Sequence, residues 1–593
     1  MAALFTTPKR NDTTAGTHVA EPDVRRRIGL AHGSWRRVTR RIVAGVVCAL
    51  TVSSLLMPSV SLAAEWVKVG GNKYNTAASD EAGTWSWDGA DDLKLNNYNG
   101  GEIQAAGKLN VNYSGTNIVT AEWIESINVS HGTNENAELN IQGDEGGTLS
   151  VTSTEDAILS TGNINIDGAG SVNATSTGLD AINAGGDLAI KGSGNVNATG
   201  ASDGIRANGN ITIDNSGTIA AKATRNPGIN AHNSLTVKGG GKVEAGSIND
   251  IAIWADGNIE ITGGSQVKAN SEEDSAVVAT RKLTVTNASL NASGAVYGVH
   301  AWEGVTFDHA TVTARASAGG SQAIALFTDW DDIVIKNGSI VDAHAEGEVS
   351  AAFSTRNDRP NEKGGHIYIS DSVVKAIARY VENGDGPIPY SENQDGETRR
   401  EPQGENIGII AQTSEGVTPA VISIIRSKVT AEGDTAAIFA RAMSADGKTI
   451  GTIKIENAAI QTPEGGKVID YRKLRDGIYE AGQAIGTGDA TVDSLYIKAV
   501  AKSTTIAPPE VAKPEDPKPD ETKPAESKPA ESKQNPKPEG SKPTKAVAAS
   551  TTKAKTTGVL AATGDTSGAA IVATVLAGTA AIAAGTMASR KRS

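Results

Sequence analysis

Three aspartates recur at a regular spacing and could together hold a cation. Asp156, Asp180 and Asp203 each stand two residues before an aliphatic residue of a recurring segment. If those segments stack at strand spacing, the carboxylates repel one another, and a hard cation such as Ca²⁺ with oxygen ligands would relieve the repulsion. Alternatively, each Asp closes a local Asx turn and is solvated. Both interpretations remain open, and calcium is the cofactor that the sequence suggests.

The position that follows each aliphatic residue forms a second set. Along successive repeats it is occupied by Asn183, Arg206, Asn230, Trp254, Val278 and His300, and Trp302 stands two residues after the last. An indole offers an apolar face to a sugar ring, while planar amide and guanidinium groups donate to hydroxyls. All of these residues except the valine are therefore candidate glycan-binding residues. The alternative is an incidental solvent face in which a neighbouring loop covers Trp254.

Residues that could catalyse glycan cleavage are sparse. Asp91–Asp92 and Asp331–Asp332 are paired carboxylates of the type that glycoside hydrolysis uses. However, the Asn-Thr-Asp, Gly-His-Gly and Arg-Ile-Lys motifs of polygalacturonases are missing, and the histidines lack ligand spacing. Arg206 beside Asp203 is the one candidate for the basic residue that a calcium-dependent lyase needs. We therefore expect no enzyme, with a polysaccharide lyase or glycoside hydrolase as the alternative.

The elements that carry these residues repeat with a period near 24 residues. Each period contains three short segments that alternate apolar and polar residues, separated by Gly, Asn or Asp. Such alternation predicts three strands per layer, with Ile, Val and Ala inside. A fixed period with equivalent residues stacked predicts parallel layers about 4.8 Å apart. The expected fold is all-β, a right-handed three-faced parallel β-helix. The repeats begin most clearly at Asn163, Asp187, Asn210, Ser234, Asn258 and Lys282.

Composition agrees with a fibrous fold and narrows the chemistry. The chain has 66 glycines and only 4% aromatic residues, which suits thin layers better than one large globular core. The net charge of -13 argues against nucleic-acid binding. The one cysteine, Cys48, lies in the apolar N-terminal segment, so the exported chain has no disulfide, zinc-thiolate site or Cys nucleophile.

Both ends of the chain read as targeting signals. A basic stretch, Trp35–Arg41, precedes the apolar run Ile42–Leu56 and small residues that suit cleavage after Ala63 or Ala64. The alternative is an uncleaved membrane anchor. At the other end, an apolar stretch from Ala569 to Ala588 is followed by a basic tail, as expected for a membrane segment with its tail in the cytoplasm.

The pentapeptide before that stretch resembles a sortase cell-wall sorting signal. It differs from the usual motif in having Ala rather than Pro at the second position, and is similar to the LAxTG form used by some high-GC Gram-positive bacteria. The resemblance implies cleavage between Thr563 and Gly564 and covalent attachment of Thr563 to peptidoglycan. A plain transmembrane tail is the alternative. The pentapeptide is Leu560, Ala561, Ala562, Thr563 and Gly564.

The sequence thus divides into five parts, of which the Lys-Pro-rich fourth part is expected to be a disordered, extended wall-spanning linker. We assign residues 1–63 to a signal peptide with a long n-region, 64–136 to an N-terminal cap, 137–502 to the β-helix with a loop insertion near 379–406, 503–558 to the linker, and 559–593 to the sorting signal, hydrophobic transmembrane helix and basic tail.

The repeat Asp203–Ile213, together with Trp85–Trp87 and Asn97–Gly101, resembles a family of bacterial β-helix carbohydrate-binding proteins. That resemblance implies binding of polysaccharide and of calcium. We therefore expect a secreted, wall-anchored adhesin or carbohydrate-binding protein. Its expected partners are sortase, peptidoglycan and a polysaccharide or host-surface glycan, with membrane contact only through the C-terminal segment before sorting. A passive structural stalk is a further alternative.

Overall fold

The computed structural model describes residues 63–509, except 123–124, 126, 131–136, 318–321, 361–362, 382–390, 393–397, 400–404, 446, 476–477 and 489–497. All regular elements in these residues are β-strands, as the sequence predicts. None of the described residues forms a helix long and apolar enough to cross a membrane. The predicted n-region and apolar run of the signal peptide, most of the linker and the sorting signal lie outside the described residues.

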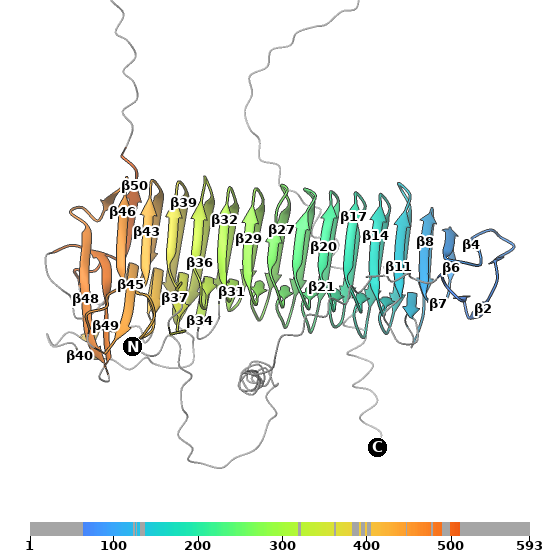
Figure 1. Cartoon of the computed structure of the whole chain (residues 1–593), viewed down its shortest axis with the longest axis horizontal. Helices are drawn as coiled ribbons and strands as arrows, with labels where there is room; N and C mark the ends of the chain where they lie inside the picture. The colour runs from blue at the N-terminus through green and yellow to red at the C-terminus, as the bar shows by residue number, and fades with distance from the viewer. Residues whose placement is uncertain are drawn as a thin grey trace, which may run out of the picture. The chain divides into compact units, whose positions relative to one another are not determined.

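The strands form three stacks, which we call sheets A, B and C, and successive coils lie side by side along the stack (Figure 1). Sheet A contains β3 (Ala78–Ser79), β4 (Trp85–Trp87), β5 (Asp92–Asn96), β8 (Lys108–Ser114), β11 (Glu138–Gly143), β14 (Asn163–Gly168), β17 (Leu188–Gly192), β20 (Ile211–Asn215), β23 (Leu235–Lys238), β26 (Ile259–Ile261), β29 (Lys282–Thr286), β32 (Gly304–Asp308), β35 (Ile333–Lys336), β38 (Ile367–Ser370), β43 (Val421–Ile425) and β46 (Thr452–Glu456).

The other two sheets contain one strand from nearly every coil as well. Sheet B contains β1 (Val67–Val69), β2 (Asn72–Tyr74), β7 (Ile103–Ala106), β10 (Ile127–Ser130), β13 (Ile158–Ser160), β16 (Ile182–Ala184), β19 (Ile205–Ala207), β22 (Ile229–Ala231), β25 (Ile253–Ala255), β28 (Val277–Ala279), β31 (Tyr297–Ala301), β34 (Gln322–Thr328), β37 (Val349–Asn357), β42 (Asn406–Thr413), β45 (Ala436–Ser444), β48 (Lys467–Arg475) and β49 (Ile478–Gly486). Sheet C contains β6 (Asn99–Gly100), β9 (Thr116–Thr120), β12 (Thr148–Ser153), β15 (Ser171–Ser176), β18 (Val196–Gly200), β21 (Thr218–Ala223), β24 (Lys242–Ser247), β27 (Gln266–Ser271), β30 (Ser289–Gly294), β33 (Thr311–Ser317), β36 (Ile340–Gly347), β39 (Val373–Tyr380), β44 (Lys428–Gly433), β47 (Ala459–Thr462) and β50 (Ser503–Ala507).

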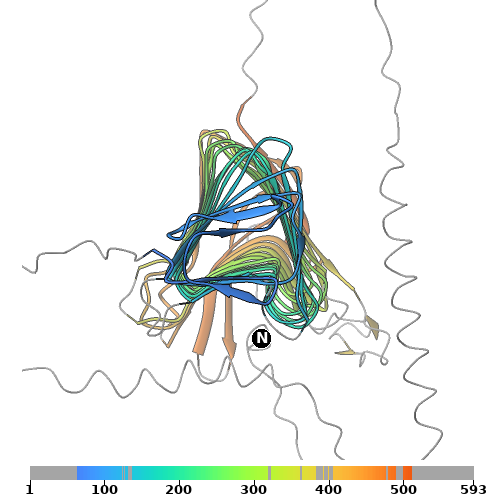
Figure 2. The ribbon, with the colours of Figure 1, turned by 90° about the vertical axis from the view of Figure 1, so that its right-hand side faces the viewer.

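Within the repeats, each strand pairs in parallel with the equivalent strand one coil away, which is the arrangement of a parallel β-helix. Ile182 pairs with Ile205, Ile205 with Ile229, and Ile229 with Ile253. These side chains point inward and are almost fully buried. Viewed along the stack, the coils superpose into a three-sided outline around this core (Figure 2). The right-handed winding stays a prediction, which rests on the preference of parallel β crossovers.

The corner between sheets A and C repeatedly needs a left-handed backbone conformation. Gly192 has φ +86°, and a Cβ there would lie 2.3 Å from the carbonyl oxygen of Gly168 in the preceding coil. In later coils the positive φ falls on Asn337, Asp371 and Arg426. The last two form a two-pronged ion pair of 2.7 and 2.8 Å between adjacent coils. The corner thus accepts a side chain where neighbouring coils leave space for it.

Antiparallel strands close the N-terminal end of the stack. β1 pairs with β2 and β7, and β4 pairs with β3 and β5. Parallel stacking starts at the pair β5–β8, which lies inside the segment 64–136 that we assigned to the cap. The cap proper is therefore shorter than that segment.

The C-terminal end is closed in the same manner. β50 pairs antiparallel with both β44 and β47, so sheet C extends five residues into the segment assigned to the linker. The hairpin β48–β49 continues sheet B beyond β45. Arg441 on β45 is tied there to Glu405 at 3.2 Å and lies 3.9 Å from Glu480 on β49, all three being buried. The predicted insertion falls between β39 and β42, where β40 (Ser391–Glu392) and β41 (Thr398–Arg399) form a short hairpin.

We predict that Ile229→Ala lowers the free energy of unfolding by about 3 kcal/mol, because it leaves a cavity between two buried neighbours in the stack. The outward-facing Thr236→Ala in the same coil is the control and should change it by less than about 0.5 kcal/mol. Chemical denaturation measures both. Equal effects of the two substitutions would contradict the inward orientation of sheet B aliphatic residues.

Candidate functional site

The predicted glycan-binding residues share one outer face of sheet B. Asn183 pairs with Arg206, Arg206 with Asn230, and Asn230 with Trp254. The column continues through Val278 to His300. Because side chains alternate along a strand, residues two positions further on share this face.

That alternation creates a second outward column which the sequence analysis missed, apart from Trp302. Each of its backbone N–H groups donates to an alanine carbonyl of the preceding coil, so the column is in register. The signal was available in the sequence, since each member stands two residues after a member of the first column. Its members are Asn208, His232, Asp256, Thr280 and Trp302. We call the two columns together the sheet B strip.

Trp254 is held in place by the second column. Its indole Nε1–H donates to Oδ1 of Asp256 at 2.9 Å. The other carboxylate oxygen of Asp256 lies 3.4 Å from Nδ1 of His232 on the neighbouring coil. Trp254 is half-buried, whereas His232 and Asp256 are exposed. The indole is therefore anchored at its nitrogen while part of its surface faces solvent.

The aspartate ladder and the first column form one hydrogen-bonded structure. Asp156 accepts the backbone N–H of Asp180 at 2.9 Å, and Asp180 accepts that of Asp203 at 2.9 Å. Each carboxylate also faces a column residue of the next coil. The donors are Asn183 to Asp156 at 3.0 Å and Asn230 to Asp203 at 2.9 Å, and a guanidinium nitrogen of Arg206 lies 3.7 Å from Asp180.

The ladder ends where the next coil has proline. Pro227 occupies the position after Asp203 in the stack, and proline has no backbone N–H to donate. Asn226 replaces the missing donor with its side-chain amide, 3.3 Å from Asp203. The three buried carboxylates thus receive N–H donors from the protein itself.

These contacts bear on the two predicted roles. The ladder carboxylates are already hydrogen-bonded, so they do not present the open set of oxygen ligands that calcium prefers. The contacts favour a structural role, and calcium binding stays a prediction. The amide donors of Asn183 and Asn230 are used within the protein. The part of the strip that remains available centres on Arg206, His232, Trp254 and Asp256.

The strip closes at its C-terminal end. Nε2 of His300 donates to Asp329 at 2.8 Å, and Arg356 donates to the same carboxylate at 2.6 Å. Burial alone would raise the pKa of Asp329, but the hydrogen bond from His300 and the charges of His300 and Arg356 hold it below its ordinary value. The following column residues, Phe327 and Ser354, are buried. The open face therefore ends near His300.

Trp302 belongs to an aromatic pair beside this end. Its ring lies 5.5 Å from that of Trp330 in an edge-to-face arrangement, and the guanidinium of Arg359 lies 3.4 Å from the Trp330 ring centre. Trp302 is only half-buried. It extends the aromatic character of the strip beyond Trp254.

The paired carboxylates noted for catalysis lie elsewhere. Asp331 forms an ion pair with Lys282 at 3.1 Å, and Asp332 accepts the backbone N–H of His366 at 2.9 Å. Burial raises the pKa of Asp332. Asp88 and Asp91 lie in the turn before β5 and Asp92 is its first residue, with one oxygen from each within 4.8 Å of the others. Whether the chain has catalytic activity stays untested by these contacts.

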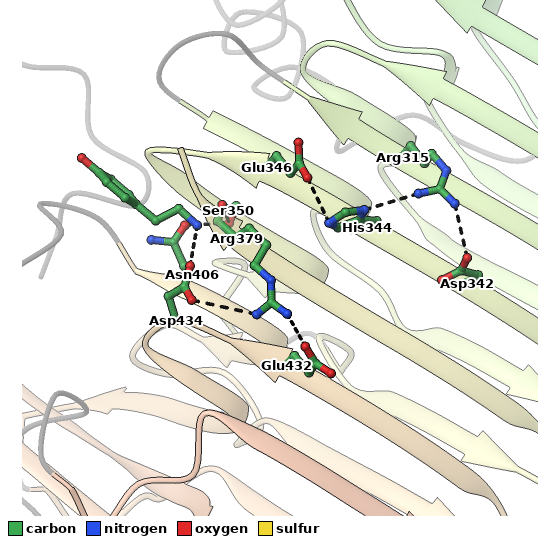
Figure 3. Close-up of polar contacts among 10 residues, drawn as sticks. Arg315, Asp342, His344, Glu346, Ser350, Arg379, Asn406, Glu432 and Asp434 are labelled. Carbon is green, nitrogen blue, oxygen red and sulfur yellow. Dashed lines mark hydrogen bonds and ion pairs between the residues drawn. The ribbon is translucent and has the colours of Figure 1, made fainter. Parts of the chain in front are cut away.

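A second set of charged side chains crosses the outer face of sheet C (Figure 3). Arg315 contacts Asp342 at 3.4 Å and His344 at 3.3 Å, and His344 contacts Glu346 at 3.3 Å. Arg379 pairs with Glu432 and lies 3.9 Å from Asp434. The arginines of this group therefore already have carboxylate partners.

Comparisons with protein-family models, curated proteins and solved structures found no match for this chain.

We predict that the chain is more stable at pH 5 than at pH 8. Burial raises the pKa of Asp156 to about 6 and that of Asp203 to about 7, from an ordinary value of about 3.9. Between the ordinary pKa and these raised pKa values, the folded state therefore binds more protons than the unfolded state. The free energy of unfolding then falls as the pH rises through about 6 and about 7.

The melting temperature at the two pH values measures this dependence. The double substitution Asp156→Asn and Asp203→Asn removes both titrating groups and should flatten it, whereas the exposed Asp214→Asn should leave it unchanged. A melting temperature that rises from pH 5 to pH 8 in the unsubstituted chain would show that other groups dominate.

Proposed function

We propose that this chain is a secreted, cell-wall-anchored surface protein that binds carbohydrate through the sheet B strip. The observation that carries the proposal is the anchored, half-buried indole of Trp254 beside exposed polar groups on adjacent coils. An indole fixed at its nitrogen offers a flat apolar surface to a ligand. Because folding already orders this ring, binding loses little further side-chain entropy.

Neighbouring groups supply the polar half of such a site. Arg206 has a half-buried guanidinium that contacts Asn208 at 3.2 Å, and His232 and Asp256 flank the indole. These groups can donate to and accept from sugar hydroxyls. Because equivalent groups lie on successive coils about 4.8 Å apart, the strip suits an extended chain of sugars better than a single sugar.

The surface location rests on the sequence at both ends. The basic and apolar leader before Ala63 supports export, and the Leu560–Gly564 pentapeptide before an apolar stretch supports sortase attachment. The Lys-Pro-rich segment between the last strand and the pentapeptide would hold the stack away from the wall.

We predict that Trp254→Ala weakens binding to the preferred glycan by about tenfold, because it removes an anchored, half-buried ring from the centre of the strip. A glycan array probed with the full chain identifies that ligand, and titration calorimetry measures the loss. Tyr368→Ala, which removes a partly exposed ring from sheet A, is the control and should bind normally.

Repeating the glycan array in the presence of a calcium chelator tests whether binding requires calcium. Loss of binding on chelation would restore the calcium prediction, and unchanged binding would leave the ladder a structural feature. No binding to any glycan by folded protein would indicate a stalk or a protein ligand. Cleavage of an arrayed polysaccharide would indicate an enzyme.

We also predict that Thr563→Ala prevents covalent attachment, since it removes the residue that sortase would join to peptidoglycan. Wild-type protein should require a muramidase for release from cell walls, and the variant should be released by detergent alone. Thr556→Ala, just before the pentapeptide, is the control. Release of the wild type by detergent without muramidase would point to a membrane anchor instead.

A further inference from the structure

A shallow groove of about 220 Å³ lies on the outer face of sheet C. It forms because short side chains follow long ones down one column of the stack. Lys242 pairs with Gln266, which pairs with Ser289, and then Thr311 and Ile340 follow. The short Ser289 and Thr311 form the floor between longer side chains.

The adjacent column supplies a cation that forms no close ion pair among the described residues. It runs from Glu244 through Lys268, Asn291 and Thr313 to Asp342. Lys242 forms an ion pair with Glu244 at 2.6 Å. Lys268 is exposed and forms no ion pair within 4.0 Å in the described part of the chain, although its charge adds to the hydrogen bond and charge of Lys242 in lowering the pKa of Glu244. Its ammonium group is available to a ligand at the groove.

The strands beside the groove carry more lysines than acids, although the chain as a whole is acidic. On three consecutive strands of sheet C, the outward residues include Lys222, Lys242 and Lys268 against the single acid Glu244. The net charge of the whole chain is -13. A basic patch on an acidic protein favours an anion, and its spread over three coils favours a polymer.

The type of cation limits the type of anion. A guanidinium matches a carboxylate through two parallel hydrogen bonds, whereas an ammonium acts as a point charge. The nearest arginine on this face, Arg315, is already paired with Asp342 and His344 (Figure 3). The charges left for a ligand are therefore ammonium groups, which contact single anionic oxygens and need no planar partner, as in a sulfate ester.

The uncharged lining suits the sugar part of such a ligand. Gln266 and Asn291 offer amides, and Ser289, Thr311 and Thr313 offer hydroxyls. No aromatic side chain lines the groove, so ring stacking of the kind available on the sheet B strip is not offered here. We propose that this groove binds a sulfated polysaccharide, as a site separate from the sheet B strip and independent of it.

The test is titration calorimetry of the full chain with a heparin hexasaccharide and with its desulfated counterpart, which keeps the carboxylates and the length. We expect desulfation to weaken binding at least about tenfold, and Lys268→Ala to weaken it about fivefold through loss of a charge-assisted contact. Asn291→Trp should abolish binding, because the indole would fill the groove.

The matched control is Lys238→Ala, which removes the same charge from sheet A, where Lys238 pairs with Asp214. It should change the affinity less than about twofold. If Lys238→Ala weakened the affinity as much as Lys268→Ala, the loss would reflect the overall charge of the chain, and the groove would not be the binding site. Equal affinity for the desulfated hexasaccharide would overturn the sulfate assignment, and absence of binding would overturn both. Trp254→Ala should bind heparin normally, so failure of one surface is distinguishable from failure of the other.

Discussion

Backbone hydrogen bonding between successive coils is the interaction on which the other features of this molecule depend. Because each strand pairs in parallel and in register with its equivalent one coil away, every side chain lies about 4.8 Å from the residue at the same position of the next coil. Inside, Ile205 lies beside Ile229, and Ile229 lies beside Ile253, so that narrow layers form a continuous core. Outside, it turns the choice of residue at a single repeat position into a column that runs along the surface.

The same stacking makes like charges and unpaired amides costly, and several outer columns pair such groups between coils. Asn110, Asn140 and Asn165 pass an amide hydrogen bond from coil to coil at 2.8 Å. In sheet A, for example, Lys238 follows Asp214, a residue of opposite charge. The aspartate ladder breaks this pattern. The ladder is stable because each carboxylate accepts N–H donors from the next coil. Burial still disfavours the charged carboxylates, which is why the pKa values of Asp156 and Asp203 are raised.

Two outer faces of one solenoid thus carry different chemistry. The sheet B strip combines an anchored indole with amide, imidazole and carboxylate groups, whereas the sheet C groove offers ammonium groups, amides and hydroxyls. The backbone arrangement beneath them is the same, so the difference lies in the side chains alone. A solenoid of this kind can present separate ligand surfaces without altering its core, because outward residues contribute little to packing.

The sequence alone determined the all-β class, the parallel stacking and the membership of the first column, because a period near 24 residues with alternating aliphatic residues leaves one register that buries most Ile and Val side chains of the repeats. It could not decide which column residues stay open. That Asn183 and Asn230 bind the aspartates and that the strip ends at Phe327 depend on contacts between coils. That Asp256 holds Trp254 depends on the orientation of two side chains within one coil. The inclusion of β50 in sheet C was equally hidden, since its partners lie far away in sequence. Local periodicity specifies the coil, but side-chain contacts across coils and at the ends are set only when the coils stack.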